Sequence, residues 1–136
     1  MAKIGKRITV DKAKYRNYVA VAKNFYEGAE VAKEYEYWNA AGVLVVHAAI
    51  AYADAVAIKL GGVKSRGENH QEAVNLIDEL VAPSQEKNVA LNQLRKIIDH
   101  KNIVSYSGEL YGKKDVDQLW KLMSRFRSWV ETILAH

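Results

Sequence analysis

The chain has 136 residues, and we expect residues 1–136 to form a single domain with one hydrophobic core. Hydrophobic residues make up 49% and charged residues 26%, a balance typical of a globular protein and not of a disordered one. The absence of cysteine excludes disulfides, thiolate chemistry and cysteine-based metal sites, and it fits a cytoplasmic protein. The net charge of +4 is compatible with a phosphate-bearing partner.

The positions of the helix-breaking residues and the lack of alternating patterns predict an all-α fold. The only proline is Pro83, and runs of alternating apolar and polar residues are few. Breaks are expected at Gly61-Gly62, at 82–84 and at Ser107-Gly108. These breaks predict an up-and-down bundle of about five helices, over residues 11–35, 39–60, 69–81, 86–105 and 115–135.

The first two predicted helices differ in character. The first is tyrosine-rich, and Thr9 or Asp11 could cap its start. The second is apolar nearly all round, which is typical of a central helix. Its run over residues 40–58 is almost long enough to span a bilayer, but it contains His47 and Asp54. We therefore expect a buried helix and no membrane span.

The remaining helices have plausible signals at their ends. Ser65 or Asn69 could cap the third helix, and Pro83 would stop it. The loop before the third helix could rim a cleft and bring Arg66 to a phosphate. Asp115 is a good cap for the fifth helix.

The fourth predicted helix has an unusual apolar face. Leu91, Leu94 and Ile98 lie on one stripe at spacings of three and four. Extending this stripe leads to Lys101 and Ser105. The sequence therefore predicts that the core-facing side of this helix becomes polar in its last two turns.

A second polar stripe runs beside it, formed by Arg95, Asp99, Asn102 and Tyr106. In the central helix, Asp54 is the matching oddity, because a buried carboxylate is costly unless cations or donors meet it. We hypothesise that Lys101 or Arg95 contacts Asp54. Such a contact could belong to a functional site or be a plain ion pair that fixes helix register.

These features together resemble the HEPN domain family over nearly the whole chain. The resemblance rests on the tyrosine-rich first helix, the apolar stretch VLVVHAAIAYADAVAIKLGG, the short third helix and a motif near the end of the fourth. It implies an all-helical bundle that forms a homodimer. Active members are metal-independent ribonucleases with an R-x4–6-H motif in a cleft between subunits. Others bind nucleotides or RNA, or pair with a minimal nucleotidyltransferase in toxin–antitoxin systems.

The family motif can be placed in two registers. Arg95 and His100 satisfy R-x4-H literally, but five residues of a regular helix separate the two side chains by roughly 140°. In the second register, Asn102, Val104 and Tyr106 match the Asn, Val and Tyr positions of the motif. Lys101 then replaces the arginine, and the histidine is either replaced by Ser105 or missing.

We favour the second register because it keeps more matching residues. It implies a degraded catalytic motif, since lysine is only a point charge and serine cannot replace the histidine base. The resulting interpretation is a cytoplasmic module that binds a nucleotide or RNA. The predicted pocket residues are Lys101, Asn102, Tyr106, Asp54 and Arg66.

Two alternatives remain open. One is an active ribonuclease, toxin-like, with Arg95 on the scissile phosphate and His100 as acid and base. The other is a structural partner of a nucleotidyltransferase. No cofactor is expected, and no metal site either, because the four histidines show no metal-binding spacing.

Overall fold

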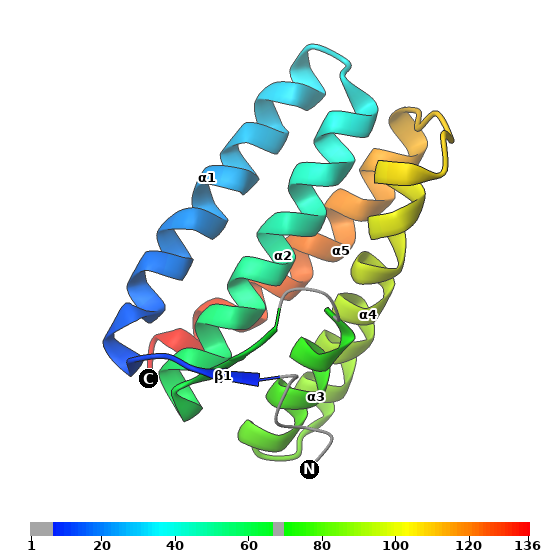
Figure 1. Cartoon of the computed structure of the whole chain (residues 1–136). Coiled ribbons are helices and arrows are strands. Elements are labelled where there is room, and N and C mark those ends of the chain that lie inside the picture. Colours follow the sequence, from blue (N-terminus) through cyan, green and yellow to red (C-terminus); the bar gives the residue numbers. More distant parts are fainter. Residues whose placement is uncertain (1–6, 67–69) are drawn as a thin grey trace.

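The computed structural model describes residues 7–66 and 70–136, and within them it contains five α-helices in an antiparallel bundle (Figure 1). The helices are α1 (Tyr15–Glu34), α2 (Trp38–Gly61), α3 (Gln71–Leu80), α4 (Gln85–Tyr106) and α5 (Lys113–Leu134). The predicted all-α bundle is confirmed. Figure 1 shows α2 in the middle, with α1 on one side and α4 and α5 on the other.

The central position of α2 explains its composition. It packs against each of the other four helices. Its mean hydropathy of 1.9 and its length would allow a membrane span, but 83% of its apolar window is buried inside the bundle. Neighbouring helices therefore already cover the apolar surface, as the sequence predicted for a buried helix.

A two-stranded antiparallel sheet, which the sequence did not predict, ties the start of the chain to the end of α2. The strands are β1 (Arg7–Thr9) and β2 (Val63–Ser65), and Ile8 pairs with Lys64. Gly62 ends α2 with a φ of 65°, a left-handed conformation that glycine adopts without strain. This turn directs the chain into β2. A short 3-10 helix, η2 (Lys12–Lys14), then leads from β1 into α1.

Several predicted helix caps need correction. Asp11 caps η2, with its Oδ1 accepting from Ala13 N, and Thr9 belongs to β1. Ser65 lies in β2 and is not a cap, while Asn69 lies outside the described residues. Asp115 is not the first residue of α5 but its third, where its Oδ2 accepts from the backbone N–H of Gly112 at 2.8 Å. That is the carboxylate half of a capping box.

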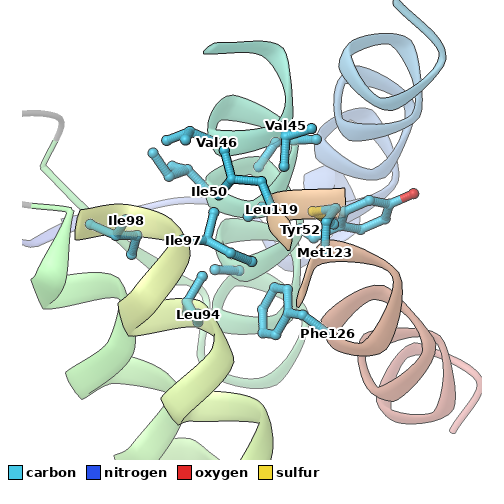
Figure 2. Close-up of a cluster of buried hydrophobic side chains, with 14 of the residues drawn as sticks. Val45, Val46, Ile50, Tyr52, Leu94, Ile97, Ile98, Leu119, Met123 and Phe126 are labelled. Atoms are coloured by element: carbon cyan, nitrogen blue, oxygen red, sulfur yellow. The ribbon is translucent and has the colours of Figure 1, made fainter. Parts of the chain in front are cut away.

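The core lies where α2, α4 and α5 meet, as Figure 2 shows. Its side chains come from α2 (Val46, Ile50), α4 (Leu94, Ile97) and α5 (Leu119, Met123, Phe126). This packing holds α4 against α2. It thereby fixes the part of α4 that carries the predicted site.

Gly42 marks a close approach between α2 and the end of α4, and it gives a first prediction. A Cβ at Gly42 would lie 2.7 Å from Val104 Cγ2. We expect Gly42→Ala to lower the free energy of unfolding by up to about 2 kcal/mol, because overpacking costs about 1–3 kcal/mol and helix propensity offsets about 1 kcal/mol of this cost. Urea denaturation followed by circular dichroism measures the change.

Gly28→Ala in α1 is the matched control, because its Cβ would meet Leu44 Cδ1 at an ordinary 3.5 Å. This variant should be neutral or slightly stabilising. Adding Val104→Ala to Gly42→Ala should recover part of the loss. Equal effects of the two glycine substitutions would contradict the close approach.

Candidate functional site

The last two turns of α4 carry the predicted site, and one part of that prediction is wrong. Lys101 is half-buried, but Ser105 is exposed and Val104 takes its place in the core. Val104 lies seven residues, or about two turns, after the buried Ile97, so the buried face follows the stripe of Ile97 and not that of Ile98. Over the last two turns of α4, the core face therefore carries a polar side chain at Lys101 and not at Ser105.

The structure does not bring Arg95 and His100 together. Helix α4 is continuous from Gln85 to Tyr106, so their side chains leave it in different directions. Arg95 is exposed, and its Nη1 donates to Asn92 Oδ1 at 3.1 Å. His100 is half-buried, and its Nδ1 lies 2.6 Å from the hydroxyl oxygen of Tyr111. The distortion that an Arg95–His100 catalytic pair requires is absent from this helix.

Asp54 has neighbours other than those predicted. No ion pair joins it to Lys101 or Arg95, all three being within the described ranges. Burial raises the pKa of Asp54 to about 6, and Lys64 and Ser65 of β2 act in the opposite direction. The unpredicted strand β2 supplies both groups, so the hypothesis of an α2–α4 ion pair is wrong.

Lys101 instead lies near two histidines. His47 of α2 and His70, the residue before α3, both have a lowered pKa. Burial is the main cause for each, followed by the positive charge of Lys101. His47 and Lys64 lower the pKa of His70 further, and the buried Nδ1 of His70 has no hydrogen-bond partner among the described residues. We call His47, Lys64, His70 and Lys101 the basic cluster.

Three further residues of the predicted pocket, Asn102, Tyr106 and Arg66, are exposed. Lys101 Nζ sits 5.8 Å from the ring centroid of Tyr106, which is 77% exposed. The structure therefore brings Lys101 to Tyr106 through the helical repeat, whereas the polar neighbours of Asp54 come from β2.

Two buried charged residues were missed. Glu72 accepts from Arg7 Nε at 2.6 Å, and Lys87 Nζ contacts Asp78 Oδ1 at 2.8 Å. Lys87 also donates to the carbonyl oxygens of Asp78 and Val81, at 3.2 and 3.3 Å. Because these carbonyls end α3, Lys87 acts as a structural cap that joins α3 to α4. Its spacing from Ala90, Leu91 and Leu94 was the available signal.

The chemistry open to the basic cluster is anion binding. The positive charge of Lys101 lowers the pKa of both histidines, that of Lys64 lowers the pKa of His70, and no carboxylate raises the pKa of either histidine. Histidines held neutral by burial still offer an N–H donor. Within the described ranges, no group of three or more His, Asp or Glu side chains is placed to hold a metal ion.

Comparison with known proteins gives the family. Searches of curated proteins and of solved structures found no match. A family model described as HEPN domain matches residues 15–133, which run from the start of α1 almost to the end of α5. This match covers most of the chain, and so the protein belongs to the HEPN domain family.

Proposed function

We propose that this HEPN protein is a binding module for RNA or a nucleotide, with Lys101 as its main phosphate contact. The observation that carries the proposal is the position of Lys101: half-buried on α4, beside His47 and His70, and in reach of an exposed aromatic ring. A phosphate placed there would meet a cation and N–H donors together.

The neighbouring side chains suit the rest of such a ligand. Tyr106 offers an exposed ring on which a base can stack, and stacking of this kind tolerates any base. Asn102 lies exposed next to Lys101 and supplies amide groups for polar contacts. These features support single-stranded RNA or a nucleotide in preference to a duplex, whose bases are already stacked.

We propose binding without cleavage because α4 does not place a histidine base and an arginine side by side. Cleavage at a ribose 2′-OH needs a base that titrates near neutral pH and a cation on the same phosphate. The regular helix keeps His100 away from Arg95, and Ser105 cannot act as the base. The proposed module therefore binds the phosphate through Lys101 but does not cleave the RNA.

Lys101→Ala should weaken the binding of a fluorescent single-stranded RNA about tenfold, because a charge-assisted contact to phosphate contributes roughly 1.5–3 kcal/mol. The slope of log K against log salt should also shrink by about one. Fluorescence anisotropy over a range of salt concentrations measures both. Lys23→Ala, which removes an exposed lysine of α1, is the charge-matched control.

The same RNA, incubated without metal, separates the alternatives. No cleavage and a loss of binding confined to Lys101→Ala would support the module. Cleavage that disappears in His100→Ala would replace the proposal with an active ribonuclease. Binding unchanged in Lys101→Ala would remove this residue from the site.

We also propose a homodimer, following the family, and a cytoplasmic location, which fits the absence of cysteine; the alternative role is that of a structural partner of a nucleotidyltransferase. Light scattering on the purified protein tests the dimer directly. A monomer at all concentrations would contradict it.

A further inference from the structure

A hollow rich in carboxylates and tryptophans lies between α1 and α5, at the end of the bundle where α1 turns into α2 (Figure 1). Its volume is about 360 Å³. The side chains that give it its chemistry come from α1 (Glu30, Lys33, Glu34), from the start of α2 (Trp38) and from α5 (Asp117, Trp120). No residue of the basic cluster or of either motif register lines it, so the hollow is separate from the proposed RNA surface.

The ring of Trp120 in this hollow already carries an ammonium group. Lys33 Nζ lies 4.2 Å from the centroid of the Trp120 ring, and Tyr26 stacks on the same ring with the centroids 4.6 Å apart. Tyr26 and Lys33 are about two turns, or roughly 10 Å, apart along α1, so they cover opposite faces of Trp120. The hollow thus favours an alkylammonium group over an aromatic face, as a cation–π contact does.

The second lysine of the hollow is matched by a carboxylate. Lys113, which also lines the hollow, places its Nζ 2.7 Å from Asp117 Oδ2. Lys113 is the main cause of the lowered pKa of Asp117, and the charge of Lys33 lowers this pKa further. Both lysines of the hollow therefore have an internal partner, an aromatic ring for Lys33 and a carboxylate for Lys113.

Two carboxylates and one aromatic ring are left over. Glu30 and Glu34 are exposed one turn apart on α1, and neither forms an ion pair within the described ranges. Trp38 is half-buried, and no other ring or cation of the described residues lies against its ring. In a chain with a net charge of +4, this hollow keeps two negative charges without a cation.

We propose that this hollow binds an aliphatic diamine in its diammonium form, such as putrescine, with Glu30 and Glu34 on the two ammonium groups and Trp38 against the chain between them. Each ammonium group would form a charge-assisted hydrogen bond to a carboxylate. Glu30 and Glu34 are separated by roughly 6 Å along the helix axis, a spacing that extended putrescine can bridge. A ligand with one cationic group would leave one of the carboxylates unpaired. The volume is within the range of small-molecule sites.

The test titrates putrescine into the full chain at low salt and follows binding by calorimetry. Glu30→Gln and Glu34→Gln should each weaken binding about tenfold, the effect of removing a charge-assisted contact of roughly 1.5 kcal/mol. Both residues are exposed, so neither substitution disturbs the core. Glu27→Gln, which removes an exposed carboxylate of α1 outside the hollow, is the matched control and should bind putrescine normally.

Lys33→Gln should strengthen putrescine binding a few-fold. It removes a like charge from the hollow and frees the face of Trp120 for the ligand. A merely structural role of Lys33 would not produce a gain in affinity. Lys23→Gln removes an exposed lysine elsewhere on α1 and controls for the change in net charge. An affinity that does not rise above that of Lys23→Gln would contradict a role of the Trp120 face in the site.

Three outcomes would overturn the site: no putrescine binding, equal losses in Glu30→Gln and Glu27→Gln, or equal affinities for putrescine and butylamine. Butylamine has the same chain with one ammonium group, so it should bind about tenfold more weakly. A lysine-containing peptide that binds the hollow more tightly than putrescine would replace the diamine with a protein partner. Lys101→Ala should leave putrescine binding intact, so failure here is distinguishable from failure of the proposed RNA surface.

Discussion

Phe126→Ala should lower the free energy of unfolding by about 3–5 kcal/mol, the largest effect on stability that we expect from a single substitution in this chain. Phe126 is completely buried in α5 and lies in the core cluster with Leu94 and Ile97 of α4 (Figure 2). Removing the ring leaves a cavity at the seam between the two helices, and the surrounding bundle can collapse into it only partly. Chemical denaturation followed by circular dichroism measures the loss.

Two variants make the result specific. Phe126→Leu keeps most of the side-chain volume and should cost clearly less than Phe126→Ala. Ile103→Ala removes an apolar side chain that is 38% exposed on α4, and it should cost still less. If Phe126→Ala were no more destabilising than Ile103→Ala, the packing of α5 against α4 would not be the core of the fold.

The helices were predictable because their apolar periodicity and their breaks agree. Gly61-Gly62 lies at the end of α2 and Pro83 in the connection between α3 and α4, and all five helices occur where they were expected. The small sheet was not predictable, because strands of three residues are too short to show an alternating pattern.

The site was predictable only in part, because the partner of a polar group depends on tertiary packing. Lys101 was identified from its place on the apolar stripe of α4, and that place is correct. Its neighbours, His47 and His70, come from other elements, and no spacing in the sequence relates them to Lys101.

Lys87, near the start of α4, shows the same pattern as Lys101: it is a lysine on an apolar stripe. This residue lies three, four and seven positions before Ala90, Leu91 and Leu94, and all four are buried. A lysine on an apolar stripe can thus serve either as a structural cap or as part of a binding surface. Sequence alone does not separate these uses, because the acceptors of Lys87 are backbone carbonyls at the end of α3.

Asp54, which lies buried near the strand β2, should make the stability of the protein depend on pH, and this is the second large effect that we expect. The pKa of Asp54 is raised from its usual 3.8 to about 6, mainly by burial. The folded protein therefore holds a proton that the unfolded chain releases, so stability falls as the pH rises from about 3.8 to about 6. The cost of ionising Asp54 in the folded protein is on the order of 3 kcal/mol above this range.

Asp54→Asn isolates this contribution, because the amide cannot ionise and resembles the protonated acid in shape. Denaturation of both proteins at several values between pH 3 and pH 8 gives the difference in their free energies of unfolding. We expect that difference to shift in favour of the variant by on the order of 3 kcal/mol between the two ends of the range. Any fixed cost of burying the amide cancels in this comparison, as do the contributions of other titrating groups. Asp78 and Asp117, for example, have lowered pKa values and act in the opposite direction.

A difference that stays constant with pH would mean that Asp54 is as well solvated in the fold as in the unfolded chain. In that case Lys64 and Ser65 would compensate fully for its burial.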